Sequence, residues 1–194
     1  MIAFLITLLI CVGGVFLLNA IVKPQYQATA SLVATLASAE SGTYNDFLAS
    51  QALTKTYEDA IQSRYIANEA KKKLNTKETA YELLERVKVR TDPGTLVIIL
   101  YAKHDHPQEA VDIANSFADA FIEKSTDIVP NANVIVLDYA NMEDASIPVS
   151  PRKMLNLAIG TFIGFFAGLV IVLYLERKRG SRRRPLRHIN TESM

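Results

Sequence analysis

Two long stretches without a charged residue constrain this chain more than any other feature of its sequence. Residues 2–22 contain no Asp, Glu, Lys or Arg, and neither do residues 155–175. Each stretch has 21 residues, and as a helix it would span roughly 31 Å, the thickness of the hydrocarbon core of a bilayer. We therefore predict two transmembrane helices. The first stretch is too long for a signal peptide and follows no Lys or Arg, so we interpret it as an uncleaved anchor.

The distribution of Lys and Arg predicts how the chain is oriented. Seven of these residues lie in the 19 residues after the second stretch, whereas three lie near the other membrane faces. Cytoplasmic flanks of membrane spans collect positive charge, so we expect residues 176–194 to be a cytoplasmic tail. Two spans then place both termini in the cytoplasm and residues 23–154 on the far side of the cytoplasmic membrane.

Residues 23–154 are predicted to form a folded domain that does not bind nucleic acid. They contain 14 Lys and Arg against 18 Asp and Glu, a net charge of −4, and a mildly acidic domain does not suit a phosphate backbone. The only cysteine, Cys11, lies in the first apolar stretch, so the domain has to fold without a disulfide. Its length of about 130 residues is enough to bury a core.

Hydrophobic periodicity predicts an α+β domain. Residues 26–36 begin with an alternation that is typical of a strand, whereas residues 45–74 and 107–126 carry apolar side chains at helical spacing. In chain order, the expected elements are a strand over 26–36, helices over 45–74 and 75–85, strands over 87–90 and 96–101, a helix over 107–126 and a strand over 134–137. The order β-α-α-β-β-α-β favours one sheet with helices packed on one face.

Local signals refine these boundaries. Ser63 is able to cap a second helix and so to break the one expected over 45–74. Thr79 followed three residues later by Glu82 has the spacing of a capping box. Residues 92–94, with the sequence Asp-Pro-Gly, supply a turn, so the strands on either side of them are predicted to form a hairpin.

His104-Asp105-His106 is the one cluster with the residue types of metal ligands. Alternate histidines on a strand need further ligands, and no third His, Cys or Glu is assured beside them. The alternative is a polar loop in which Asp105 or His106 caps the helix that begins at Pro107. The sequence also has no phosphate-binding glycine loop, nucleophile elbow or HExxH motif, and its carboxylates form no evident acid–base pair. We therefore expect no catalytic residues, no cofactor and no metal.

Three glycines predict a helix contact in the second span. Gly160, Gly164 and Gly168 are spaced by four residues and share one helix face, which lets another helix approach closely. The partner is either the first span, through Gly13 and Gly14, or a neighbouring subunit.

Residues 145–153 form a Pro-rich connector before the second span. Pro148 and Pro151 fix φ and favour stiff, extended backbone. We expect this segment to hold the domain at a set height and angle above the membrane. The alternative is an ordinary linker with helix-stopping prolines.

These motifs, in this order, resemble the Wzz-type chain-length determinants, also called polysaccharide co-polymerases. Tyr26-x-Ala28-x-Ala30-x-Leu32 follows the first span, and Pro148-x-x-Pro151 precedes a Gly-rich second span. The helix after the strand over 96–101 carries Ala110, Ile113, Ala114, Asn115 and Phe117. The resemblance covers residues 22–176. It implies a non-enzymatic homo-oligomer of the bacterial cytoplasmic membrane. Such an oligomer works with a Wzy-type polymerase and a lipid-linked polysaccharide to set the length of a capsular or exopolysaccharide.

The resemblance is to a short form of this family. Larger members carry a long helical arm, whereas here residue 126 is followed closely by the strand at 134. Members usually begin with a cytoplasmic segment, whereas this sequence enters the first span at Ile2, so its start is expected to be either truncated or misassigned. Short forms resemble the membrane adaptor of split tyrosine-kinase systems, in which a cytoplasmic tail activates a separate kinase. The resemblance therefore implies a bacterial tyrosine kinase that acts in trans.

The basic tail is the predicted contact for membrane lipids and for that kinase. Lipid head groups require only positive charge, which Arg182, Arg183 and Arg184 supply. Docking of a kinase requires particular side chains instead. The candidates for this docking are Pro185, Leu186, His188 and Ile189.

A two-span sensor or receptor with an outer ligand-binding domain is the main alternative function. It requires a cytoplasmic output domain, and the 19 residues after residue 175 are too few to form one. A channel would require polar groups along a span, and neither span contains a charge. An outer hydrolase would require a nucleophile beside a base, and no such arrangement is evident.

Overall fold

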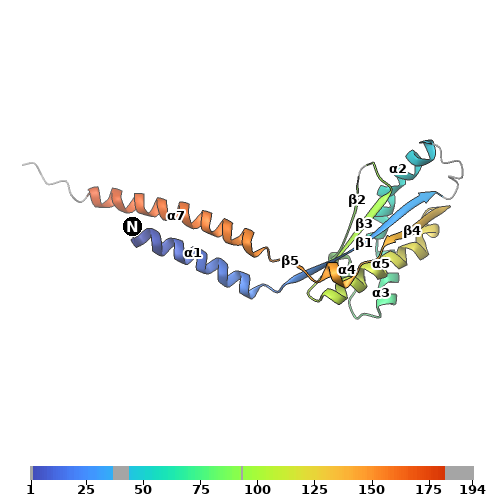
Figure 1. Ribbon diagram of the computed structural model, residues 1–194, viewed down its shortest axis with the longest axis horizontal. Coiled ribbons are helices and arrows are strands. Elements are labelled where there is room, and N and C mark those ends of the chain that lie inside the picture. The colour runs from blue at the N-terminus through green and yellow to red at the C-terminus, as the bar shows by residue number, and fades with distance from the viewer. Residues whose placement is uncertain (1, 37–43, 93, 182–194) are drawn as a thin grey trace, which may run out of the picture. The chain divides into compact units, whose positions relative to one another are not determined.

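The computed structural model describes residues 2–36, 44–92 and 94–181, and these fall into two compact units. Residues 24–150 form one unit, which contains a sheet and its helices (Figure 1). The segments before and after it form the other unit, which is a pair of helices.

The sheet unit is built on five antiparallel strands, with β1 in the interior of the sheet. The strands are β1 (Gln25–Leu36), β2 (Val87–Thr91), β3 (Val97–His104), β4 (Ala132–Asp138) and β5 (Pro148–Ser150). Their order is β2-β3-β1-β4, and β5 pairs with the first residues of β1. The pairing of β2 with β3 confirms the predicted hairpin.

Side-chain caps begin three helices of this unit, two of them at the residues that the sequence predicted. The helices are α2 (Tyr44–Ile61), α3 (Arg64–Leu74), α4 (Ala80–Arg86), α5 (Pro107–Ile128) and α6 (Met142–Ala145). Ser63 Oγ accepts a hydrogen bond from the backbone N–H of Ile66 and so caps α3, which confirms the predicted break. Thr79 and Glu82 form both hydrogen bonds of the predicted capping box at the start of α4.

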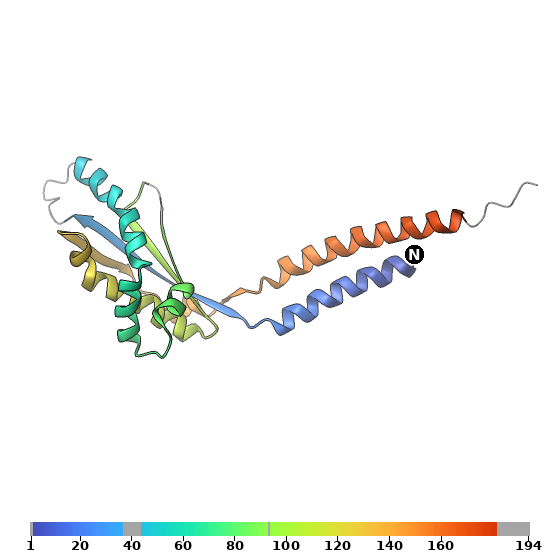
Figure 2. The same cartoon turned by 180° about the vertical axis from the view of Figure 1, so that it is seen from behind.

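The core lies between the sheet and its helices, which cover one face of the sheet in both views (Figures 1 and 2). Every second residue of β1 from Ala28 to Ala34 has 0% exposure. Three of these four residues are alanines, which leave room for Phe117 and Phe121 of α5, both fully buried. The Tyr57 ring packs edge-on against Phe121, with 5.7 Å between the ring centroids. This arrangement agrees with the predicted α+β class, with helices on one face.

The observed order of elements is longer than the predicted one. The helix predicted over 45–74 is two helices, so three helices precede β2. After β4 the chain adds α6 and β5, which were not predicted. β5 has only three residues and is a strand because it pairs with Gln25 and Tyr26 of β1. A local pattern cannot reveal a pairing between segments so far apart in the sequence.

The second unit consists of two apolar helices, α1 (Ile2–Ile21) and α7 (Lys153–Ser181). Both are long and apolar enough to cross a membrane, over residues 4–21 and 153–175. They lie side by side in both views (Figures 1 and 2). The spans predicted over 2–22 and 155–175 therefore fall on these helices, and α7 continues for a further turn and a half.

Candidate functional site

The glycine face of α7 packs against α1. A Cβ atom added at Gly164 would lie 2.9 Å from the Cβ atom of Cys11, and one added at Gly168 would lie 2.7 Å from Cδ2 of Phe4. A Cβ atom at Gly160 would also collide with a side chain of α1. Carbon atoms ordinarily approach no closer than about 3.5 Å, so glycine is what lets the two backbones come this near.

The face of α1 that meets these glycines does not include Gly13 or Gly14. A Cβ atom at either position would meet nothing within 4 Å, and both residues are exposed. The sequence left open whether the glycine face packs against the first span or against a neighbouring subunit. In the structure it packs against the first span, but Gly13 and Gly14 take no part in the contact. The α1 residues nearest to that face are Phe4, Leu8, Cys11 and Val15.

A hydrogen bond between two amide side chains joins the same helices. Asn156 Nδ2 of α7 donates to Asn19 Oδ1 of α1 at 2.7 Å. Hydrogen bonds between spans contribute about 0.6 to 2 kcal/mol. Asn156 lies four residues before Gly160, so it continues the spacing of the glycines along α7. Neither asparagine was predicted, and the signal that identifies them is a polar side chain within a predicted apolar span.

The Pro-rich connector is partly a strand. Pro148 begins β5 and lies opposite Tyr26 of β1. Proline has no N–H to donate, and the first residue of a strand is one of the positions that tolerate it. Pro151 follows β5, and its carbonyl oxygen accepts the backbone N–H of Lys153 at 2.9 Å. The segments through which the chain enters and leaves the sheet unit are therefore paired with each other.

The two histidines of the loop before α5 make different contacts. His104 is 5% exposed; its Nε2 lies 2.9 Å from Glu109 Oε2, and its Nδ1 accepts the backbone N–H of His106 at 3.1 Å. Asp105 Oδ1 also lies 3.0 Å from Nδ1 of His104. His106 occupies the N-cap position of α5, but its side chain makes no capping hydrogen bond. Within the described ranges, no three His, Cys, Asp or Glu side chains are grouped to hold a metal ion.

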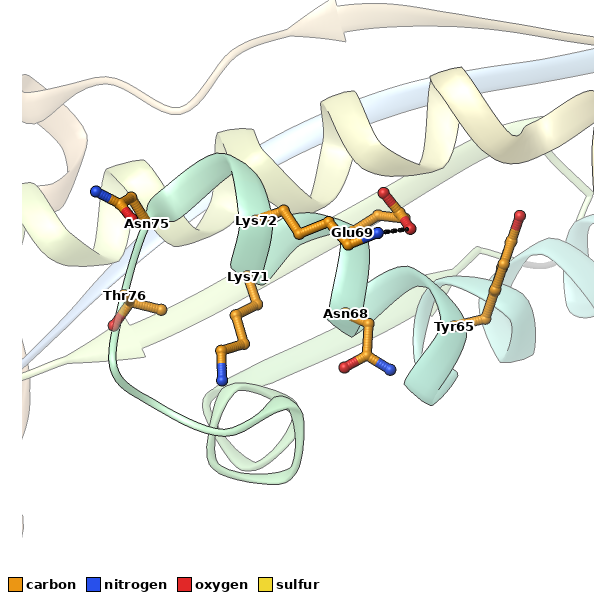
Figure 3. Close-up of a pocket in the computed structure, with 7 residues that line it drawn as sticks. All are labelled: Tyr65, Asn68, Glu69, Lys71, Lys72, Asn75 and Thr76. Carbon is orange, nitrogen blue, oxygen red and sulfur yellow. Dashed lines mark hydrogen bonds and ion pairs between the residues drawn. The ribbon is translucent and has the colours of Figure 1, made fainter.

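A polar hollow of about 630 Å³ lies along α3 (Figure 3). Glu69 accepts a hydrogen bond from Lys72 at 2.7 Å, and this bond raises the pKa of Lys72. Tyr65 donates its hydroxyl proton to Asp127 at 3.2 Å. The lining residues of the hollow are Tyr65, Asn68, Glu69, Lys71, Lys72, Asn75 and Thr76.

The predicted tail contacts lie outside the described residues. The described part of α7 ends at Ser181. The residues beyond it include Arg182, Arg183, Arg184, Pro185, Leu186, His188 and Ile189.

Comparisons with known proteins connect the chain with polysaccharide biosynthesis. A family model described as "GNVR: G-rich domain on putative tyrosine kinase" matches residues 123–177, from the end of α5 into α7. The chain is 29% identical over 133 residues to a Bacillus subtilis protein named probable capsular polysaccharide biosynthesis protein YwqC. It is 31% identical over 147 residues to the capsular polysaccharide biosynthesis protein CpsC of Streptococcus pneumoniae. A CpsC of Streptococcus agalactiae is 26% identical over 165 residues.

These matches cover most of the chain but less of each relative. They include 69% of the chain for YwqC and 74% for the pneumococcal CpsC. The chain spans 54% and 61% of the length of these two relatives.

Proposed function

We propose that this chain, a relative of the Wzz-type polysaccharide co-polymerases, controls the length and assembly of a capsular or exopolysaccharide. The predicted family resemblance is confirmed by the GNVR match and by the relatives named for capsular polysaccharide biosynthesis. The observation that carries the proposal is that these relatives match 69 to 83% of the chain. The family model itself matches residues 123–177, which include β4, β5 and most of α7.

The proposed role is to organise the polymer rather than to catalyse a reaction. The sheet unit is connected to an apolar helix at each end, so a polysaccharide bound to it would be tethered at the membrane. A unit of 127 residues, 24–150, is small compared with a long polymer. We therefore propose a homo-oligomer that works with a Wzy-type polymerase and a lipid-linked polysaccharide. Because the glycine face is filled within the chain, the contacts between subunits would use other surfaces.

The proposed location is the bacterial cytoplasmic membrane, with both termini in the cytoplasm. The seven Lys and Arg residues that follow residue 175 support this orientation. In the same orientation, the arginines of the tail lie where anionic lipid head groups attract them.

A second part of the proposal is that the tail activates a tyrosine kinase in trans. It is supported by the family model, whose description refers to a tyrosine kinase. Truncation after Arg184 should preserve membrane insertion and lower phosphorylation of the kinase in reconstituted membranes. Replacement of Arg182, Arg183 and Arg184 by Lys should have less effect if only charge is recognised. Full phosphorylation of the kinase with the truncated chain would show that the residues after Arg184 do not activate it.

Deletion of the gene tests the main proposal. We expect an altered length distribution of a surface polysaccharide, or loss of its assembly, with unchanged repeat-unit chemistry. A change in repeat-unit composition would instead indicate an enzyme that builds the unit. The sensor alternative is not supported by the names of the relatives, which refer to capsule biosynthesis.

A further inference from the structure

One face of the sheet is left bare by the helices. Figures 1 and 2 show α2, α3 and α5 on the same side of the strands. The even-numbered residues of β3 and those of β1 from Ala28 to Ala34 are buried beneath these helices, and the odd-numbered ones point to the other side. The open-face residues of β1, β2 and β3 are all exposed or partly exposed. We call this surface the open face.

The half of the open face formed by β2 and β3 has two unpaired amines around a tyrosine. Lys88 of β2 lies directly opposite Tyr101 of β3, and Thr29 of β1 lies opposite Tyr101 on its other side. Lys103 is two residues along β3 from Tyr101, so it points to the same side and lies opposite Gln27. Among the residues that the structure describes, these five side chains have no hydrogen-bond or ion-pair partner.

The other half of the open face differs because its polar groups bond to one another. Ser31 Oγ donates to Asp138 at 3.3 Å, and Asn133 Nδ2 donates to Thr35 Oγ1 at 3.3 Å. The free hydrogen-bonding groups are therefore concentrated over β2 and β3. Lys88 and Lys103 are the unpaired charges on this half of the open face, and Lys103 also lines a hollow with Glu82, Glu85 and Arg86. Arg86 is paired with Glu78 and Glu82 is bonded to Thr79, so the two lysines outnumber the remaining carboxylate of Glu85, although residues 23–154 carry a net charge of −4. This local excess of positive charge would attract an anion.

We infer that the open face over β2 and β3 binds an anionic polysaccharide chain. The inference rests on the proposed function, which supplies the polymer, and adds its site and charge. Lys88 and Lys103 would contact carboxylate or phosphate groups of the polymer. The Tyr101 ring between them would pack against sugar C–H groups, and the Thr29 and Gln27 side chains would bond to hydroxyl groups. A flat surface that crosses neighbouring strands suits an extended polymer better than a small molecule, which binds in concave pockets.

Binding to defined oligosaccharides tests this inference. The full chain is reconstituted in phosphatidylcholine nanodiscs and titrated with hyaluronan oligosaccharides, which carry carboxylates, and with neutral dextran oligosaccharides. We expect hyaluronan to bind more tightly than dextran and to bind more weakly as salt rises, since salt screens exposed charges. The double substitution Lys88→Gln with Lys103→Gln should raise the dissociation constant for hyaluronan roughly tenfold, as the loss of two exposed ion pairs predicts.

Lys71→Gln with Lys72→Gln is the matched control, because it removes two amines from α3 on the helix-covered side. It should leave the affinity for hyaluronan unchanged. Equal weakening by both double variants, or no binding by the wild-type chain, would overturn the inference. A changed oligomeric mass with unchanged affinity in the Lys88 and Lys103 variant would also overturn it, because the face would then contact a second copy. If deletion of the gene alters polysaccharide length while this variant binds normally, the proposed function stands and the site is wrong.

Discussion

Substitution of Gly164 by alanine should separate the two apolar helices. The added Cβ atom would lie 2.9 Å from the Cβ atom of Cys11 and 3.3 Å from Cδ1 of Leu8. The first distance is roughly 0.6 Å shorter than an ordinary carbon contact of about 3.5 Å. Rotation of the cysteine side chain cannot relieve it, because the position of a Cβ atom is set by the backbone. The helices have to move apart instead.

Overpacking of this kind typically costs about 1–3 kcal/mol. The equilibrium between paired and separated helices should therefore shift by roughly five- to 150-fold towards separation. Cys11→Gly in the same chain removes the atom that collides, so the double variant should recover part of the loss. Gly13→Ala is the matched control: the same change in the same helix pair, at a position where a Cβ atom meets nothing within 4 Å.

The shift can be measured by titrating detergent micelles with dodecyl sulfate. Förster transfer between labels at Leu5 and Leu173, which are exposed and lie near the ends of α1 and α7 that are not joined to β1 and β5, reports separation of the helices. We expect Gly164→Ala to separate at a lower dodecyl sulfate fraction than the wild type, and Gly13→Ala to match the wild type. Equal midpoints for the two alanine variants would refute the packing of the glycine face on α1.

Three further predictions concern topology, the connector and the sheet unit. A cysteine at Tyr44, which is 74% exposed, should react with a membrane-impermeant thiol reagent in intact cells; absence of labelling would reverse the proposed orientation. Joint replacement of Pro148 and Pro151 by alanine should shift the polysaccharide length distribution at unchanged expression, because the segment that joins β5 to α7 becomes less stiff; an unshifted distribution would make the prolines dispensable. Thr79→Ala should lower the thermal midpoint of the sheet unit by a few degrees through loss of the capping box. Hydrogen bonds from Thr79 lower the pKa of Glu82. The stability that these bonds contribute is therefore present above the ordinary pKa of glutamate, and it is lost as the pH falls through the lowered pKa of Glu82. If Thr79→Ala lowers the thermal midpoint by the same amount at acidic and neutral pH, the proposed role of ionised Glu82 is contradicted.

Features with a local physical cause could be predicted from the sequence. Ser63 and Thr79 accept hydrogen bonds from backbone N–H groups three residues later, so their spacing alone located the starts of α3 and α4. The hairpin of β2 and β3 could be predicted from the change from helical to strand periodicity and from the turn between the strands. The spans could be predicted from their length and from the absence of charged residues.

Features that depend on pairing between distant segments could not be predicted in the same way. β5 is a strand only because Pro148 meets Tyr26. The spacing of Gly164 and its neighbours predicted a close contact, but which face of α1 receives it depends on the rotation of that helix. The hydrogen bond between Asn19 and Asn156 depends on the same rotation. Whether two asparagines 137 residues apart can meet depends on the relative register of the helices.

The molar-mass distribution of the surface polysaccharide tests the central claim most directly. It is measured by size exclusion with light scattering for the parent strain, the deletion strain, and the deletion strain that expresses either the wild-type chain or the chain truncated after Arg184. We predict that deletion changes the distribution and that the wild-type chain restores it. The truncated chain should restore it only in part if the kinase also contributes to length. A deletion strain with the distribution of its parent would contradict the account.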